Sequence, residues 1–512
     1  MLFNSLSFAI FLPLVFGLYW LIGGCGHAGR VTLPCRDGHA GRVTLPRRPF
    51  HLWHPFHLQN LFIVAASYVF YGWWDWKFLL LITFTSLWAW GSGLAIARLA
   101  DTPQGYGGGV RWIVALALVV NLGILGVFKY YNFFLDNAVA LLNALGFAAH
   151  PSSLQVILPV GISFYTFQAL SYVLDVSRGT IKPTRDLVAF LAYVSFFPLL
   201  VAGPIERATN LLPQFLKPRR FDYGLAVEGS RQMLWGFFKK IFVADTCAAV
   251  ANEIFTLYAH PSSLSIWAGV LCFTFQIYGD FSGYSDIAIG CSKLFGIRAM
   301  RNFNTPYFAR DIAEFWRRWH ISLTTWFRDY LYIPLGGSRC GKLKKIRNTF
   351  AIFLVSGFWH GANWTFVAWG AFHAVCFLPL LLSGKNRRNV TTVVAEGRRL
   401  PSAREAAQML VTFLLVVVGW TFFRAPDIST AFAWLSKMLT FCDLEYHEVG
   451  LGSLSRIVLP VAVMLVVEWI SRERDALVVP KSRALRWLAY WALALLIVWF
   501  RPAPQAFIYF QF

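Results

Sequence analysis

Long apolar runs, separated by short charged or glycine-rich stretches, recur from one end of the 512-residue chain to the other. A run of about 20 apolar residues can cross roughly 30 Å of hydrocarbon as a helix. The pattern predicts spans near 5–22, 58–74, 78–97, 112–128, 158–176, 187–203, 264–290, 405–423, 456–470 and 487–500. We therefore expect an all-α polytopic integral membrane protein with about 10 to 12 transmembrane helices.

Two stretches predict helices that lie along the membrane surface instead of crossing it. Residues 129–146 are rich in Tyr, Phe and Asn. Residues 217–243 combine Trp and Phe with six cationic side chains, Lys217, Arg219, Arg220, Arg231, Lys239 and Lys240. Helices that mix basic and aromatic residues favour the interface between lipid and water.

Composition and charge agree with this class of protein. The chain is 57% hydrophobic and 14% charged, and its net charge is +21. Lys and Arg gather in short loops such as 339–347 and 385–404, which the positive-inside rule places on the cytoplasmic side. We therefore expect membrane lipid, and not nucleic acid, to surround the chain. The eight cysteines form no CxxC pair, so neither a disulfide framework nor a zinc or other metal site is indicated.

An exact duplication follows the first predicted span. The nine residues Gly-His-Ala-Gly-Arg-Val-Thr-Leu-Pro occur at 26–34 and again at 38–46. No periodic fold needs only two such copies. We interpret 23–57 as an inserted, poorly ordered loop in an otherwise single membrane domain that covers 1–512.

A histidine lies in the middle of an apolar run. Residues 349–381 carry no formal charge, and His360 lies near their centre. Trp359 precedes it, while Gly361 and Asn363 follow where a helix would have to bend or break. Because the flanking basic loops share one side, the run should enter the membrane and return. An ionisable residue at membrane depth is a functional candidate by default, and the alternative is a histidine that only packs.

A second histidine lies on a predicted amphipathic helix at 310–330. At 100° per residue, one face carries Trp316, Trp319, His320, Leu323, Phe327 and Tyr330. The opposite face carries Glu314, Arg317, Arg318, Arg328 and Asp329. The helix is either a surface anchor or the cytoplasmic roof of the cavity that contains His360, where it would present His320 to an incoming donor.

The predicted span at 264–290 contains two aspartates and two serines that cannot simply face lipid, Asp280, Ser282, Ser285 and Asp286. Of these, Asp280, Ser282 and Asp286 could orient a catalytic base or bind water. His373 lies 13 residues beyond His360, and we interpret it as structural.

Two buried histidines without a nucleotide-binding loop, a serine-hydrolase elbow or a metal cluster favour acyl transfer. A neutral imidazole can accept the proton of a hydroxyl as that hydroxyl attacks a thioester. Transfer across a membrane also requires donor and acceptor to meet at one buried point, which predicts a central tunnel.

Several stretches resemble the membrane-bound O-acyltransferase (MBOAT) family, in particular its bacterial alginate O-acetyltransferase branch. The matching residues cover nearly the whole chain outside 23–57 and fall at 1–8, 66–74, 158–168, 281–290, 303–308, 316–326 and 356–364.

The resemblance implies the MBOAT fold, with His360 as the catalytic histidine and His320 as a second polar position of the site. Trp359, Asn363, Trp316 and Trp319 become candidate tunnel-lining residues, beside the polar residues of 280–286. It also implies acetyl-CoA as acyl donor, no bound cofactor, the bacterial inner membrane as location, and periplasmic partners similar to SGNH hydrolases.

Three alternatives stay open at this point. Within the family, the chain could transfer D-alanine to teichoic acid or acetyl groups to peptidoglycan. Outside it, a transporter could also contain two membrane histidines.

Overall fold

The computed structural model describes the chain apart from residues 25–54, 101–106, 151–155, 202, 258–260, 388–391, 395–397, 445–450, 475–477, 500–504, 506 and 511–512. The predicted insertion lies almost wholly outside the described residues, since α1 ends at Gly24 and α2 begins at Pro55. Every regular element in the described part is helical, so the all-α class is confirmed.

The chain divides into two compact units. Unit 1 comprises residues 1–230 and 288–300, and unit 2 comprises 231–287 and 301–512. Two helices cross the division, α9 (Tyr223–Phe237) and α11 (Ser263–Leu294). The prediction of one membrane domain stays a prediction.

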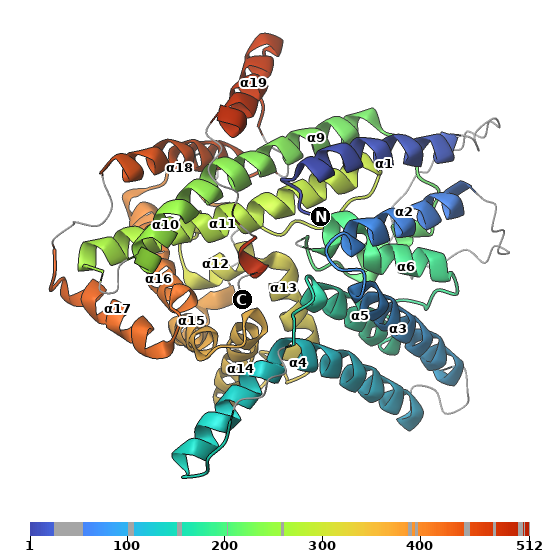
Figure 1. Ribbon diagram of the computed structural model, residues 1–512, viewed down its shortest axis with the longest axis horizontal. Helices are drawn as coiled ribbons and strands as arrows, with labels where there is room; N and C mark the ends of the chain where they lie inside the picture. The colour runs from blue at the N-terminus through green and yellow to red at the C-terminus, as the bar shows by residue number, and fades with distance from the viewer. Residues whose placement is uncertain are drawn as a thin grey trace. The chain divides into compact units, whose positions relative to one another are not determined.

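Unit 1 contains eight complete α-helices among its described residues (Figure 1). They are α1 (Leu6–Gly24), α2 (Pro55–Gly72), α3 (Phe78–Ala100), α4 (Gly108–Ala144), α5 (Ile162–Ser177), α6 (Leu187–Ser195), α7 (Phe197–Leu200) and α8 (Ala208–Phe215).

Two predictions in unit 1 were wrong. The separate surface helix at 129–146 does not form, because its residues continue the span before them as the 37-residue helix α4. The span at 187–203 is broken into α6 and the four-residue α7, with non-helical Phe196 between them. Pro198 follows this break at the start of α7, where a proline needs no backbone donor.

Unit 2 contains the remaining elements. They are the π-helical turn η1 (Phe238–Ala244), α10 (Asp245–Leu257), η2 (Pro306–Phe308), α12 (Ile312–Arg318), α13 (Ile321–Phe327), the π-helical turn η3 (Arg328–Tyr332), α14 (Lys342–His360), α15 (Trp364–Leu382), η4 (Lys385–Arg387), α16 (Ala403–Arg424), α17 (Ile428–Thr440), α18 (Leu451–Ser471), α19 (Arg483–Trp499) and η5 (Ile508–Phe510). The sequence pattern had indicated no helix at α17.

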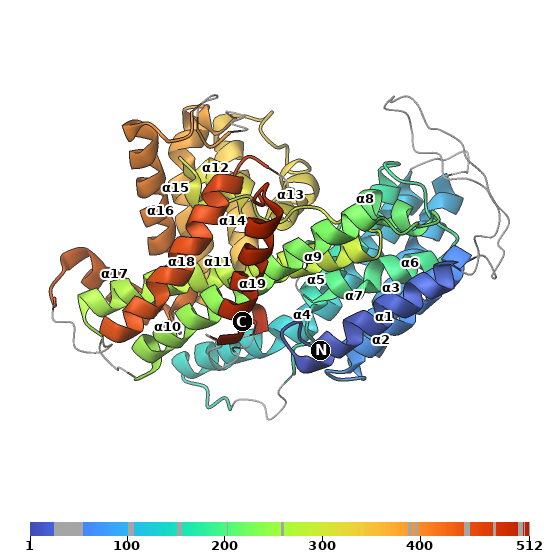
Figure 2. The same cartoon turned by 90° about the horizontal axis from the view of Figure 1, so that it is seen from above.

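In unit 2 the antiparallel helices α14 and α15 pack closely on each other, and α15 also packs against α16 (Figure 2). Gly357 and Gly370 bring α14 and α15 together. A Cβ atom at Gly357 would collide with the carbonyl oxygen of Phe366, and one at Gly370 with that of Phe353. Small residues at such positions let two membrane helices approach closely.

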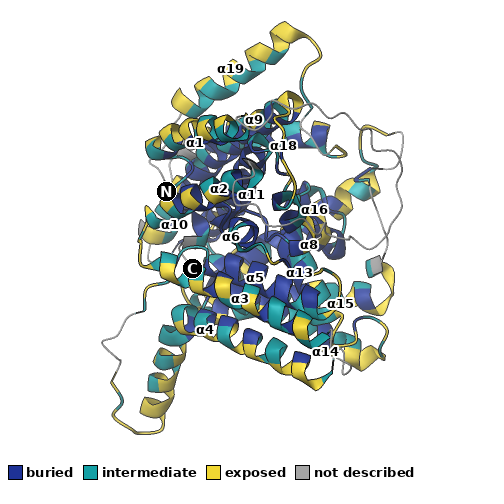
Figure 3. Ribbon diagram, turned by 90° about the vertical axis from the view of Figure 1, so that its right-hand side faces the viewer, coloured by how far each residue is buried: buried dark blue, intermediate teal, exposed yellow. Residues whose placement is uncertain are grey.

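Six described helices are long and apolar enough to cross a membrane: α1, α3, α4, α11, α15 and α16. Their burial differs, as Figure 3 shows. The apolar stretch of α11 is 72% buried within the protein, whereas that of α1 is 17% buried. The larger number of spans, the re-entrant segment and the central tunnel stay predictions.

Candidate active site

His360 is the last residue of α14, at the turn of the α14–α15 hairpin. The predicted break is confirmed, since Gly361 is extended and Asn363 starts the next helix. The His360 side chain is buried, with 3% of its surface exposed. Its ring contacts those of Trp359, Trp369 and Phe423, at centroid distances of 5.0, 5.1 and 5.4 Å. The histidine therefore lies inside unit 2 and does not face outward.

A polar neighbour of His360 comes from a segment far along the chain. Tyr509 Oη lies 3.2 Å from His360 Nδ1, within hydrogen-bond distance. Desolvation raises the pKa of the Tyr509 phenol well above its usual value of 10. The hydroxyl therefore stays protonated near neutral pH, and it can become a nucleophile only by passing its proton to a base. A hydroxyl hydrogen-bonded to an imidazole is the arrangement of an activated nucleophile.

His320 lies close by, with its ring centroid 6.5 Å from that of His360. Asn302 Oδ1 lies 3.1 Å from His320 Nδ1, and the Asn302 Nδ2 amide donates to Ser285 Oγ at 3.0 Å. The backbone N–H of Ser322, which can only donate, also points at Asn302 Oδ1 at 3.4 Å, so this atom is the amide oxygen and Nδ1 is the protonated nitrogen of His320. His320 Nε2 is buried without a hydrogen-bond partner among the described residues.

The backbone at His320 differs from the prediction of one continuous helix over 310–330. The helix breaks between α12 and α13, where His320 adopts a left-handed conformation with φ of 42°. Histidine is one of the few non-glycine residues enriched in this region, and strained residues cluster at functional sites. The break turns the His320 side chain toward Asn302, a contact that helical periodicity does not predict.

The expected polar face of this segment is also partly wrong. Arg317 and Arg328 are exposed, but Glu314 and Arg318 are only 2% and 4% exposed. Glu314 pairs with Arg318 at 2.9 Å and with Arg310 at 3.1 Å. The two guanidinium groups neutralise the buried Glu314 carboxylate. Amphipathic spacing, which assumes that charged residues face water, therefore does not predict its burial.

Asp280 does not face lipid. Its Oδ1 pairs with Lys240 Nζ at 2.9 Å, and its Oδ2 accepts a hydrogen bond from the backbone N–H of Ile508 at 2.7 Å. Asp280 therefore touches the residue next to Tyr509.

Asp286 has different partners from those of Asp280. It pairs with Lys239 Nζ at 2.6 Å and accepts a hydrogen bond from Gln232 Nε2 at 2.9 Å. Ser282 is buried, and its hydroxyl has no hydrogen-bond partner among the described residues.

The prediction that 217–243 lies along the surface is wrong for Lys239 and Lys240. These side chains are 3% and 1% exposed. Two acidic residues in an apolar helix require buried cations, and two consecutive lysines supply them. Matching the charges of the two segments could have revealed the pairing.

The remaining candidates surround the histidines at different distances. Trp316 contacts Trp369, which contacts His360, so it belongs to the second layer of rings. Trp319 is 1% exposed and packs against Phe303 at 5.1 Å and Trp420 at 5.1 Å. The structure gives these tryptophans packing contacts, and their contact with substrate stays a prediction.

Asn363 caps a helix. Its side-chain oxygen accepts from Thr365 N at 3.0 Å, and its amide donates to Pro426 O at 2.9 Å. His373 is fully buried among aromatic rings, with no hydrogen-bond partner for either nitrogen among the described residues. Aromatic packing in this region agrees with the structural interpretation of His373.

Sequence reasoning missed Tyr509 and Asn302. Tyr509 belongs to a short segment rich in aromatic residues at 507–510, and no sequence periodicity links it to His360. Asn302 lies between helices, where no spacing rule applies. An asparagine near a histidine-bearing segment was the only available signal for this contact.

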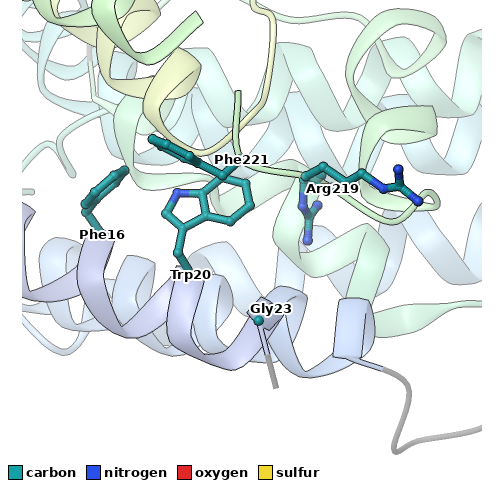
Figure 4. A pocket seen from close by; sticks show the side chains of 7 residues that line it. Phe16, Trp20, Gly23, Arg219 and Phe221 are labelled. Atoms are coloured by element: carbon teal, nitrogen blue, oxygen red, sulfur yellow. The ribbon is translucent and has the colours of Figure 1, made fainter. Parts of the chain in front are cut away.

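A groove in unit 1 contains none of these residues. Phe16, Trp20 and Phe221 form its aromatic walls beside Arg219, as Figure 4 shows. The predicted catalytic histidines belong to unit 2 and do not line this groove.

Comparison with known proteins places this chain in a family. A model of the membrane-bound O-acyltransferase family matches residues 182–415, which include both His320 and His360. The chain is 41% identical over 399 residues to the probable alginate O-acetylase AlgI of Pseudomonas syringae pv. tomato, covering 78% of this chain and 73% of that protein. It is 38% identical over 458 residues to the protein of the same name in Pseudomonas putida, covering 89% and 84%.

The name of a third relative indicates a different polymer. The peptidoglycan O-acetyltransferase of Helicobacter pylori is 34% identical over 412 residues, covering 74% of this chain and 73% of that protein. With similarity over most of its length, the chain belongs to the membrane-bound O-acyltransferase family and is a multi-pass membrane O-acyltransferase.

Proposed function

We propose that this chain takes an acetyl group from acetyl-CoA at the cytoplasmic face of the bacterial inner membrane and passes it to an exported polysaccharide. Alginate is the first choice of polymer, because the relatives with 38–41% identity carry the name alginate O-acetylase. No cofactor takes part, and periplasmic proteins similar to SGNH hydrolases complete the transfer.

One observation carries the mechanism: the 3.2 Å contact between Tyr509 Oη and His360 Nδ1 inside unit 2. His360 acts as general base. As a hydroxyl oxygen attacks the thioester carbonyl, a new C–O bond forms and the C–S bond breaks. The hydroxyl proton goes to His360, which then protonates the departing CoA thiolate. Atoms and charges balance without a further reactant.

The Tyr509 hydroxyl is the first group to attack the thioester, because it already lies within hydrogen-bond distance of the base His360. In the next step His360 can take the proton of the acceptor hydroxyl and give it to the departing Tyr509 oxygen, so the acetyl ester of Tyr509 becomes a donor in turn. The acetyl group would pass from thioester to aryl ester and finally to a sugar ester. His320 supports this step from the donor side with its Nε2, which has no hydrogen-bond partner in the described part of the chain.

The donor test uses purified protein in proteoliposomes with labelled acetyl-CoA. We expect free CoA to appear in step with acetyl transfer to polymer. Uptake of a solute with the thioester left intact would instead indicate a transporter and overturn the proposal.

Peptidoglycan acetylation is the second candidate, favoured by the 34% identity to the Helicobacter pylori protein. Deleting the gene separates the two, because only one polymer should lose its acetyl esters. Loss from alginate supports the first choice, and loss from peptidoglycan supports the second. D-Alanine on teichoic acid would require D-alanine, not acetate, as the transferred group.

A further inference from the structure

The C-terminal segment that carries Tyr509 is bound into unit 2 by buried polar contacts. The backbone N–H of Ile508 donates to Asp280 Oδ2 at 2.7 Å. Lys240 Nζ donates to the backbone carbonyl of Gln505 at 3.2 Å. Lys240 and Asp280 are 1% and 2% exposed, so water does not compete for these bonds. The segment is therefore attached through its backbone on the side where Tyr509 meets His360.

Lys240 joins three parts of unit 2 at one point. Its Nζ lies 2.9 Å from Asp280 and 2.8 Å from Asp245, in addition to its bond with the segment. Because Lys240 bonds to Oδ1 of Asp280, the second oxygen Oδ2 is available to the Ile508 N–H. Removing the lysine would leave two buried carboxylates facing each other beside the segment.

Close helix packing puts Lys240 in place. A Cβ atom at Gly236 would lie 2.6 Å from the carbonyl oxygen of Gly283, and one at Gly283 would lie 2.8 Å from that of Gly236. The wider π-helical turn η1 begins two residues after Gly236. A Cβ atom at Gly283 would also lie 2.9 Å from the backbone nitrogen of Lys240, so the backbone of η1 lies directly against α11, which carries Asp280.

Aromatic rings on the same stretch of α11 complete the attachment. Phe507 packs on Tyr284 with ring centroids 4.3 Å apart, and Tyr509 packs on Phe281 at 4.6 Å. Phe281 also contacts His320 at 4.6 Å. One turn of α11 thus holds the C-terminal segment by charge and by ring packing next to both histidines.

We propose that Lys240 and Asp280 are positioning residues that dock Gln505 and the residues 507–509 and set the Tyr509 hydroxyl against His360. The inference rests on the proposed function for the role of Tyr509 in transfer, but the docking itself does not.

The neighbouring pair Lys239–Asp286 provides a matched control. It is equally close, at 2.6 Å, and its other partners are Glu468 at 3.9 Å and Gln232. Within the described chain, none of these contacts reaches residues 505–509. Loss of Lys239 should therefore weaken the fold without releasing the C-terminal segment.

Hydrogen exchange read by mass spectrometry on the C-terminal peptide tests the docking directly. We expect the Ile508 amide of the detergent-purified protein to exchange at least ten-fold faster in Lys240→Met than in Lys239→Met. Lys240→Arg, which keeps the charge, should restore most of the protection. Ile508→Pro is a second variant that leaves the body of unit 2 intact and removes the N–H, and its neighbouring amides should also lose protection.

Kinetics then connect docking to chemistry. Lys240→Met should lower kcat for acetyl transfer to the level of Tyr509→Phe, with KM for acetyl-CoA unchanged. The double variant should be no slower than either single variant, because residues that act through one step are not additive. The docking would be overturned if two folded variants kept wild-type exchange rates. These rates are that of the Ile508 amide in Lys240→Met and those of the neighbouring amides in Ile508→Pro. Full activity of Tyr509→Phe with released exchange would refute the role of Tyr509 alone.

Discussion

At the residue scale, the chemistry of the site depends on which ring nitrogen of each histidine carries a proton and which one can accept a proton. Asn302 Oδ1, which also accepts from the backbone N–H of Ser322, holds His320 with Nδ1 protonated and Nε2 without a partner among the described residues. His360 instead has a phenol at Nδ1. We therefore propose different roles for the two histidines, whose ring centroids are 6.5 Å apart. His360 can accept a proton from a neighbouring hydroxyl, while His320 offers a neutral acceptor to an arriving group.

A pH-dependent stability follows from His320, which lies between two short helices outside the six candidate spans. Burial lowers its pKa well below the usual 6.5. Between pH 6.5 and that lowered value, the unfolded chain binds a proton at His320 and the folded chain does not. Stability should therefore fall as pH falls below 6.5, by up to about 1.4 kcal/mol per pH unit for one full proton.

Thermal unfolding of the purified protein between pH 7.5 and pH 5 measures this effect. His320→Gln removes the titrating group, so its Tm should decline less over that range than that of the wild type. Equal declines in both proteins would show that His320 does not titrate between the two states.

At the element scale, a tight helical hairpin positions His360. The bare Cα of Gly370 lies against the Phe353 carbonyl, and that approach fixes α14 on α15 and so places the turn. Burial of the hairpin turn was predictable from the break at Gly361. The interruption of the 310–330 helix at His320 was not, because its apolar spacing continues through the break. Side-chain contacts with Asn302 outweigh helical propensity there.

We predict that Gly370→Ala destabilises the protein, because the added methyl group must displace backbone atoms of α14. Overpacking of this kind costs roughly 1–3 kcal/mol. Gly126, on α4, has no atom within 4 Å of the position of its Cβ. Gly126→Ala should therefore leave Tm unchanged or raise it, since alanine favours helix by about 1 kcal/mol over glycine. Equal Tm values for the two variants would mean that close packing at Gly370 does not hold the hairpin.

At the scale of the whole molecule, the sequence predicts class and family better than it predicts contacts. Apolar runs and local motifs are short-range signals, so the all-α class, the hairpin at His360 and the O-acyltransferase family all follow from them. The contacts of the site are long-range. Tyr509 meets a residue 149 positions away, and Lys240 meets a carboxylate 40 positions away, and no periodicity encodes either pairing.

One measurement tests the central claim most directly, namely that His360 carries the transfer. Initial rates of acetyl transfer from labelled acetyl-CoA should be compared for wild type, His360→Ala and His150→Ala at equal amounts of folded protein. His150 is exposed and belongs to unit 1, so its loss controls for removing a histidine. We predict that His360→Ala loses at least 100-fold in rate, within the range for a general base, while His150→Ala keeps the wild-type rate. A folded His360→Ala protein with wild-type rate would contradict the account.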